Sequence, residues 1–338
     1  MRVKRRKFLL LGAGALASGV IKGCNRGSAP GTVRIPRGAG GVGFLPLLVM
    51  EKERLIQKHA PGLEPDWIPV GGPSAVNGAL LSGAIDFVAA GPPAFLILWD
   101  RTRDNDKVMG VSAITSLPMY LNANVARLQT LDDFKDNDKI AVTAVKVSIP
   151  AIAMQMYAEE KHGALEWRRF DRLARSMTHG NGVNALLGGS GAISAHFTSP
   201  PFYQRELKDP KVKVHTVITT NDIMKGSSTF TMLSTTTAFY EKNPKVVAAV
   251  LAALEEANQK IRDDKKWAAD VLFSATAKSS FKPEDMFEVV SDPAVKFTTT
   301  PENIMKYGEF MHRVGTIKKK PSNWKEMFFP EIYGAQGN

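Results

Sequence analysis

One supersecondary pattern occurs twice in this chain. In residues 79–83 and again in residues 185–189, an apolar helical run ends in glycine, and a short apolar strand follows. A proline pair then opens the next helix, at residues 92–93 and 200–201. Glycine ends helices because it tolerates a left-handed backbone, and proline begins them because the first helical N–H has no partner to lose. Two copies of the pattern predict two similar α/β units in one chain.

Short apolar strands alternate with helical periods from residue 32 onward. The predicted fold class is therefore α/β, with two doubly wound lobes, a central ligand cleft and two crossover hinges. We expect lobe 1 over residues 32–116, lobe 2 over 117–219, and a return to lobe 1 with C-terminal helices over 220–338. The hinges are expected near residues 116–120 and 218–221. Ligands of such sheets bind at the carboxyl ends of the strands.

The positive charge of the chain is concentrated at its start. The formal net charge is +11, from 44 Lys and Arg residues against 33 Asp and Glu residues. Residues 1–23 hold six of the basic residues and no acidic one, so the remainder carries only a small excess. A nucleic-acid-binding protein concentrates basic residues on one face of its folded part. We therefore expect no nucleic-acid partner.

The first 31 residues predict export. Arg5 and Arg6 precede an apolar run, and the sole cysteine of the chain, Cys24, follows a small residue. This pattern is typical of a twin-arginine export signal that ends in a lipoprotein box, with Cys24 as the lipidated residue. An ordinary export signal is the alternative. We expect an export signal over 1–23, a tether over 24–31 and a membrane anchor through the lipid.

Five segments carry a resemblance to a known family. They read GFLPLLV at 43–49, NGALLSGAIDF at 77–87, LDDFK leading to KIAV within 131–142, AHFTSPPF at 195–202 and NPK at 243–245. The chain resembles the type 2 periplasmic solute-binding proteins of ABC importers, in the nitrate/taurine/sulfonate-type group. The resemblance implies capture of a small solute and its delivery to an ABC permease and its ATPase. It implies a monomer that is no enzyme, needs no cofactor and lies at the periplasmic or cell-surface side.

Ligand contacts are expected from loop backbones and helix starts, where N–H groups are free. Ser74 and Ser148 could equally be plain helix N-caps, and His196 could be a packed core residue. The candidate residues of lobe 1 are Gly40, Gly41, Phe44, Gly71, Gly72, Ser74, Gly91, Pro92 and Pro93. Those of lobe 2 are Lys146, Ser148, His196, Thr198 and Ser199.

These loops predict an anionic solute such as a sulfonate, a carboxylate or nitrate. Helix N-termini favour negative charge, and Arg37 and Lys146 lie near the loops in sequence. A neutral pyrimidine or another aromatic heterocycle is the alternative ligand. Phenylalanines would then form a stacking wall, at Phe44, Phe95, Phe197 and Phe202.

Two other classes of function are weighed against solute delivery. Residues 38–43 fit G-x-G-x-x-G after a strand, which favours an exported nucleotide-dependent oxidoreductase. However, the expected acid is missing where the second strand ends at Val70, and Pro46 falls in the helix that would hold the pyrophosphate. The six histidines show no metal-ligand spacing. An exported sensor that feeds a signalling receptor would use the same fold as a transport protein.

Overall fold

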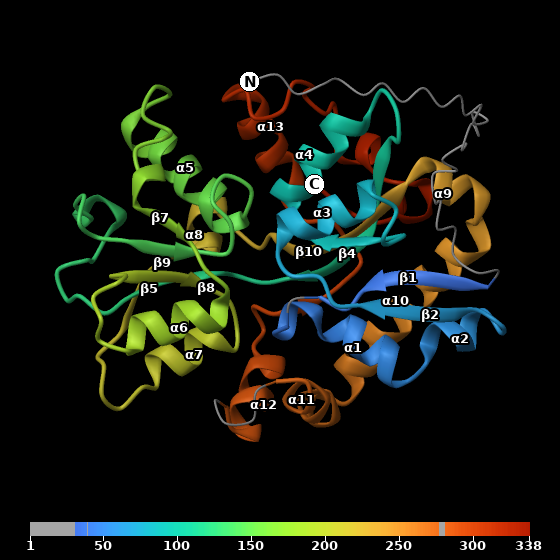
Figure 1. The fold of residues 1–338 in the computed structure, drawn as a ribbon, viewed down its shortest axis with the longest axis horizontal. Helices are drawn as coiled ribbons and strands as arrows, with labels where there is room; N and C mark the ends of the chain where they lie inside the picture. The colour runs from blue at the N-terminus through green and yellow to red at the C-terminus, as the bar shows by residue number, and fades with distance from the viewer. Residues whose placement is uncertain (1–30, 39, 277–280) are drawn as a thin grey trace, which may run out of the picture.

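The computed structural model describes residues 31–38, 40–276 and 281–338. Its strands form three sheets, with orders β1-β2, β11-β4-β10-β3 and β7-β6-β8-β5-β9 (Figure 1). The strands are β1 (Thr32–Pro36), β2 (Glu64–Ile68), β3 (Val88–Ala90), β4 (Val108–Ser116), β5 (Tyr120–Ala123), β6 (Ile140–Val142), β7 (Ala174–Ser176), β8 (Ala195–Thr198), β9 (His215–Thr219), β10 (Thr229–Thr236) and β11 (Lys296–Phe297).

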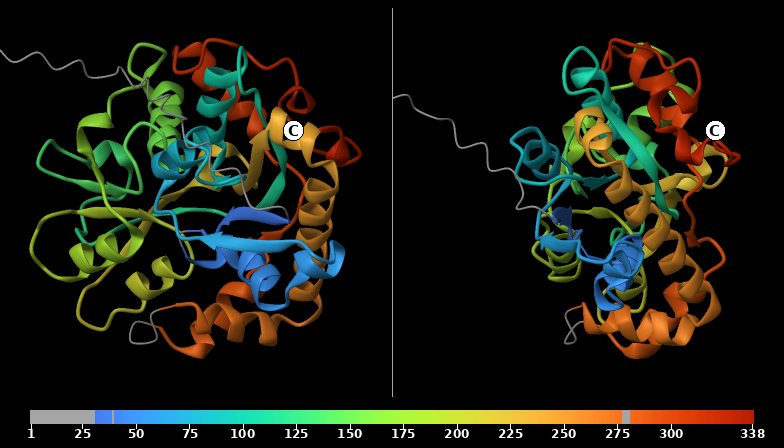
Figure 2. Two further views of the ribbon diagram at one scale, coloured as in Figure 1. Left: turned by 45° about the vertical axis from the view of Figure 1, so that its right-hand side comes forward. Right: turned by 90° about the vertical axis from the view of Figure 1, so that its right-hand side faces the viewer.

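Helices cover these sheets, and α11 and α12 follow the long helix α10 at one end of the molecule (Figure 2). The helices are α1 (Leu45–Lys52), α2 (Leu55–His59), α3 (Pro73–Leu81), α4 (Pro92–Thr102), α5 (Ile149–His162), α6 (His179–Leu187), α7 (Phe202–Leu207), α8 (Thr220–Met224), α9 (Thr237–Lys242), α10 (Pro244–Asp263), α11 (Lys265–Ser274), α12 (Pro283–Ser291) and α13 (Ile304–Arg313).

Two lobes lie side by side in Figure 1. We name lobe 2 the five-stranded sheet β5–β9 with helices α5–α8, and lobe 1 the other two sheets with the remaining helices. The arrangement confirms the predicted α/β fold class. The exact domain boundaries given above stay predictions.

The five-stranded sheet is mixed and the neighbouring strands of the four-stranded sheet are all antiparallel, details that the predicted doubly wound lobes did not include. In lobe 2, β5 runs antiparallel to β8 and β9, whereas β6, β7 and β8 are parallel to one another. In lobe 1, β10 runs antiparallel to β3 and β4, and β11 runs antiparallel to β4. Strands β5 and β10 each enter their lobe directly from the other lobe. Such a strand arrives without the crossover helix that makes two neighbouring strands parallel.

Helix α10 shows how the core of lobe 1 is built. Its fully buried residues recur at helical spacing, at Val250, Leu254, Ala257 and Ile261, and this face packs on α1 and α2. Residues 45–59 form two helices and not one, because Arg54 adopts a left-handed conformation (φ 52°) that separates α1 from α2. The break keeps Leu55 and Ile56 in the core.

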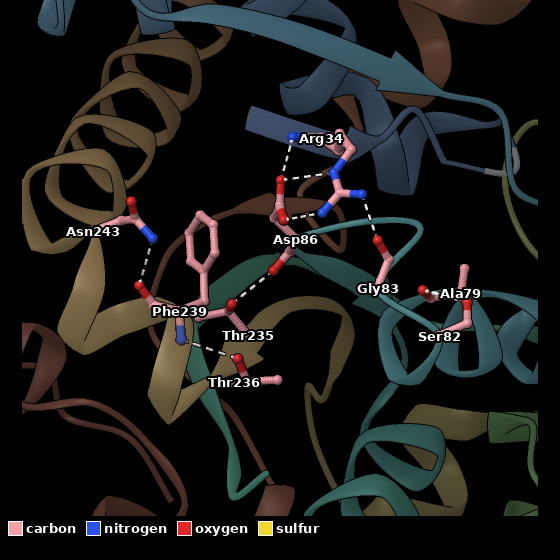
Figure 3. A network of polar contacts seen from close by, with 9 residues as sticks. All are labelled: Arg34, Ala79, Ser82, Gly83, Asp86, Thr235, Thr236, Phe239 and Asn243. Carbon is pink, nitrogen blue, oxygen red and sulfur yellow. Dashed lines mark hydrogen bonds and ion pairs between the residues drawn. The ribbon is translucent and has the colours of Figure 1, made fainter. Parts of the chain in front are cut away.

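A polar network ties three elements of lobe 1 together (Figure 3). The Arg34 guanidinium of β1 donates to both carboxylate oxygens of Asp86, at 2.6 and 3.2 Å, and to the Gly83 carbonyl. The Asp86 carbonyl accepts a hydrogen bond from Thr235 Oγ1 of β10 at 2.6 Å. Because Asp86 is only 6% exposed, its pairing with Arg34 offsets the cost of burying the charge. The network fixes β1 against β3 and β10, which carry one side of the pocket described below.

The export prediction lies outside the described residues, since Arg5, Arg6 and Cys24 all precede residue 31. Within the part of the chain that is described, no helix is both long and apolar enough to cross a bilayer.

Candidate functional site

A pocket of about 100 Å³ lies between the two lobes. Lobe 1 lines it with Pro36, Gly38, Gly40, Phe44, Val70, Gly72, Pro73, Val76, Ala89, Gly91, Ala94, Phe230 and Thr231. Lobe 2 lines it with Thr143, Val147, Ser148, Ile149, Pro150, His179 and Ser199, and Met119 of the first crossing completes the wall. Both lobes therefore contribute to one cavity, and any relative movement of the lobes changes its shape.

The lobes touch each other beside this pocket. The Val42 N–H of lobe 1 donates to the Pro200 carbonyl of lobe 2 at 3.4 Å. At a second contact between the lobes, Gly91 packs so closely on Ile149 that an added Cβ would lie 2.8 Å from Ile149 Cδ1. The absence of a side chain at Gly91 thus permits the close approach of α4 to α5.

Four helices begin at the pocket. The N-cap residues of α3, α4 and α5 (Gly72, Gly91 and Ser148) line it, as does His179, the first residue of α6. Gly72 has a φ of 77°, a conformation that favours glycine, so the chain can turn sharply into α3. The N-terminal, positive ends of four helices therefore lie at one cavity, and each favours negative charge by about 0.3–1 kcal/mol in exposed sites.

One side of the pocket is polar and continues into the protein interior. Ser199 Oγ lies 3.3 Å from His179 Nε2, and His179 Nδ1 lies 3.2 Å from His196 Nε2. His196 Nδ1 lies 2.6 Å from Glu206 Oε1, and both of these side chains are fully buried. Burial raises the pKa of the Glu206 carboxyl to about 8 and lowers the pKa of the His196 imidazole to about 3. We name the four side chains of Ser199, His179, His196 and Glu206, in this order from the pocket inward, the Ser199–Glu206 chain.

The rest of the wall is mainly apolar. Within the described residues, the pocket lining contains no Asp, Glu, Lys or Arg, and its one ionisable side chain is His179, whose pKa is lowered to about 3 by burial. Arg37 and Lys146, which lie near the predicted loops in sequence, do not line the pocket. Arg37 forms an ion pair with Glu51, and Lys146 is an exposed residue with a φ of 72° that is absent from the lining.

Six of the predicted site residues line the pocket, namely Gly40, Phe44, Gly72, Gly91, Ser148 and Ser199. Ser148 is the N-cap of α5, but its hydroxyl donates to the Ala144 carbonyl at 2.5 Å and caps no helical N–H. Its lone pairs remain as possible acceptors. Whether any of the six contacts a solute stays a prediction.

The other predicted residues lie outside the lining. Pro92 and Pro93 occupy the first turn of α4 and are buried in the core, and Ser74 is exposed at the second position of α3, so it is not the N-cap. His196 and Thr198 are fully buried behind the wall. The remaining three are Gly71, Gly41 and Lys146, of which Gly41 faces the Pro200 carbonyl.

Sequence reasoning missed His179 and Phe230. His179 follows Thr178, whose hydroxyl accepts a hydrogen bond from the Asn181 N–H and caps α6. A Thr before an apolar helical run is a recognisable N-cap signal, and it could have indicated His179 as a residue at a helix start. No comparable signal marks Phe230, because β10 reaches the pocket only through its return from lobe 2.

No model of a protein family matches the sequence, and no curated protein matches it. Solved structures do match. The alkanesulfonate-binding protein SsuA from Xanthomonas axonopodis pv. citri, bound to MOPS, has a TM-score of 0.67 at 16% identity, covering 87% of this chain and 96% of that protein. The periplasmic nitrate-binding protein NrtA from Synechocystis PCC 6803 has a TM-score of 0.69 at 14% identity, covering 88% and 85%. The periplasmic aliphatic sulphonate binding protein SsuA from Escherichia coli has a TM-score of 0.64 at 16% identity, covering 90% and 100%.

These likenesses establish the class of fold. The chain has the fold of the periplasmic binding proteins, with two α/β lobes and a pocket between them. At such low identity the similarity shows the fold alone, so the solute and the biological role are argued below as proposals.

Proposed function

We propose that this protein is an extracytoplasmic solute-binding protein that captures a small, anion-headed solute and delivers it to an ABC importer. The observation that carries the proposal is a single cavity lined by both lobes, at which four helices begin. Helix starts supply positive potential and, at the first-turn residues that are not proline, N–H groups without a helical acceptor, and these suit a carboxylate, a sulfonate or nitrate. The names of the structural neighbours, which include sulfonate- and nitrate-binding proteins, support the same class of ligand.

The size and lining of the pocket favour a compact solute. Its volume of about 100 Å³ suits a short apolar tail on a small charged head. Phe44, Val76 and Ile149 would pack against the tail, while the Ser199 hydroxyl lies where a polar contact with the head can form. Because the described lining holds no cationic side chain, the head would be neutralised by helix dipoles and hydrogen bonds rather than by an ion pair.

A neutral aromatic heterocycle is the second candidate ligand. Phe44 and Phe230 both line the pocket, with ring centroids 6.4 Å apart in an edge-to-face arrangement. The other phenylalanines predicted to form a stacking wall do not reach it. Phe95 and Phe197 belong to the core, and Phe202 stacks on His179 at 5.2 Å.

A thermal-shift panel on the purified protein separates these candidates. A ligand at about 100 times its dissociation constant adds about 2.7 kcal/mol to the free energy of unfolding. We expect stabilisation by short alkanesulfonates, carboxylates or nitrate. Stabilisation by pyrimidines alone would favour the second candidate, and stabilisation by polyamines or sugars without any anion would reject both.

The location of the protein forms a separate part of the proposal. We infer that Arg5 and Arg6 direct export and that lipidated Cys24 tethers the mature chain outside the cytoplasm. Replacing both arginines by Lys should leave precursor in the cytoplasm, and Cys24→Ala should release a soluble form or leave the precursor uncleaved. Cell fractionation of the wild type and the two variants tests this. Wild-type protein found free in the cytoplasm would contradict the location and the transport role together.

A further inference from the structure

The Ser199–Glu206 chain connects the pocket to the buried carboxyl group of Glu206 through three side chains, those of Ser199, His179 and His196. Its three contacts measure 3.3, 3.2 and 2.6 Å in order from the pocket inward. Each imidazole has one nitrogen toward each neighbour, so a neutral ring must accept on one side and donate on the other. Once the donor at one end of the chain is known, the direction of every other hydrogen bond along the chain follows.

The inner end of the chain is fixed by Asn122. Its Nδ2 donates to Glu206 Oε2 at 2.9 Å, while its Oδ1 accepts from Thr216 Oγ1 at 2.8 Å. This pairing occupies Glu206 Oε2 as an acceptor. A proton on Glu206 would therefore lie on Oε1, the atom that faces His196 Nδ1.

Complete burial favours a net charge of zero on the Glu206–His196 pair. Both side chains are 0% exposed, and the described ion pairs give the Glu206 carboxyl a single basic partner, His196. An uncompensated carboxylate in such a place is strongly disfavoured. The pair is neutral overall when it holds one proton on Glu206 Oε1, and also when that proton lies on His196. In both arrangements His196 Nε2 keeps its own hydrogen and donates it to His179 Nδ1.

We propose that Glu206 and His196 hold one buried proton between them, and that this proton orients the Ser199–Glu206 chain toward the pocket, where the Ser199 hydroxyl donates to an acceptor atom of the solute. With His196 Nε2 as donor, His179 Nδ1 accepts, His179 Nε2 donates to Ser199 Oγ, and the Ser199 hydrogen is free to point into the cavity. The inference rests on the proposed function, because it specifies the polarity of the same site.

The orientation has two consequences. His179 donates to Ser199, which is the reverse of the arrangement in which an imidazole removes a proton from a serine nucleophile, so the pair is set for binding rather than for acyl transfer. Loss of the buried proton reverses every bond: His196 then donates to the Glu206 carboxylate, and the Ser199 hydroxyl turns toward His179. The pocket then loses the hydrogen-bond donor that Ser199 supplies, so anion capture weakens as the proton leaves.

Few other titratable groups face the chain. Helix α6 contributes His179 itself, and its Gly182 leaves the space that the His196 ring fills, since a Cβ there would lie 2.5 Å from His196 Nε2. The remaining titratable groups on the packed elements are Arg205 and Tyr203 on α7, Tyr120 on β5 and His215 on β9. Arg205 acts on Glu206 through charge alone, Tyr120 and Tyr203 stack on each other, and His215 lies 2.8 Å from the Leu128 carbonyl.

The first test needs no ligand. Nitrogen-15 NMR of the histidine rings of the mature protein, without added solute, reports which ring nitrogens carry hydrogen between pH 6 and pH 9.5. We expect hydrogen on Nε2 of His179 and of His196 at pH 6.5. In Glu206→Gln the amide can accept from Asn122 and donate to His196 Nδ1, so the same pattern should persist over the whole range. His196 with hydrogen on Nδ1 alone at pH 6.5 would overturn the inference, even if Glu206→Gln failed to fold.

The second test uses pentane-1-sulfonate as the probe, titrated calorimetrically over the same pH range. Wild-type affinity should fall by up to about tenfold per pH unit once the buried proton is lost, and Glu206→Gln should bind equally at every pH. His162→Gln, which changes a partly exposed histidine paired with Asp132, should keep the wild-type profile. Identical profiles for wild type and Glu206→Gln would overturn the inference. The expected ring tautomers without any sulfonate binding would support the chain and reject the proposed solute class.

Discussion

Met119 and Thr220 exchange two hydrogen bonds where the two connections between the lobes meet. The Met119 N–H donates to Thr220 Oγ1 at 2.9 Å, and the Thr220 N–H donates to the Met119 carbonyl at 2.9 Å. Met119 also lines the pocket, and Thr220 is only 1% exposed. The two connections thus form one hydrogen-bonded unit beside the candidate site, and we expect any rotation of the lobes to take place about it.

Replacing Thr220 by Val should test the strength of this unit. The substitution keeps the shape of the side chain but leaves the buried Met119 N–H without an acceptor, so we expect the free energy of unfolding to fall by about 1–3 kcal/mol. Urea denaturation measures the change. In the control Thr237→Val, the Lys107 carbonyl loses the threonine hydroxyl but keeps the Thr237 N–H, so the loss should be smaller. Equal losses in the two variants would contradict the special role of Thr220.

Gly91→Ala should weaken solute capture without unfolding the protein. The φ of Gly91 is −74°, which alanine adopts freely, but the new Cβ would lie 2.8 Å from Ile149 Cδ1 across the lobe boundary. We expect the affinity for a bound anion to fall at least about tenfold, because the lobes can no longer close to the same distance. The double variant Gly91→Ala with Ile149→Ala should recover part of the loss. Unchanged affinity in Gly91→Ala would show that the contact plays no part in binding.

Sequence reasoning predicted the part of the site that comes from short-range signals. Gly72, Gly91 and Ser148 stand directly before helices that follow strands, and helix starts after strands are readable from proline, glycine and serine. The same signals failed by one or two positions at Ser74, Pro92 and Pro93, which lie inside the helices rather than at their caps. A helix start is recognisable from sequence. Which residue at that start faces the cavity depends on the backbone conformation at the point where the chain enters the helix.

The polar wall was not predictable, because it depends on contacts between distant segments. His196 was expected as either a core or a cleft residue, and it is a core residue that reaches the pocket through His179, 17 positions earlier. Lys146 was predicted from its position in sequence to contact the ligand. It is an exposed residue with a left-handed backbone conformation, and it does not line the pocket. Hydrophobic periodicity determines burial, but it does not determine which buried polar groups meet.

Stability should decrease as the pH rises from about 6.5 to 8. Burial raises the pKa of Glu206 from 4.5 to about 8, so in this window the native state holds a proton that the unfolded chain has released. One such proton lowers the free energy of unfolding by up to about 1.4 kcal/mol per pH unit as the pH increases. Urea denaturation at several pH values measures the slope. Glu206→Gln should remove the alkaline decrease, and a decrease of equal slope in that variant would assign it to other groups.

Below pH 6.5 the dependence of the free energy of unfolding on pH has the opposite sign. Burial lowers the pKa of His179 and His196 to about 3, so below pH 6.5 the unfolded chain binds two protons that the native state does not. The two protons that the unfolded chain binds on these histidines outweigh the single proton that the native state holds on Glu206. The free energy of unfolding should therefore fall as the pH decreases below 6.5. The maximum is therefore expected near pH 6.5, in the wild type but not in Glu206→Gln, where the alkaline side should be flat.

Calorimetric titration of the mature protein with pentane-1-sulfonate at pH 6.5, alongside Ser199→Ala, tests the central claim most directly. The account predicts one solute per protein molecule in the wild type and at least about tenfold weaker binding in Ser199→Ala, since a hydrogen bond to a charged group contributes about 1.5–3 kcal/mol. Equal affinity in the two proteins would contradict the assignment of Ser199, and binding of a polyamine or a sugar in place of every anion tested would contradict the claim that this pocket captures anion-headed solutes.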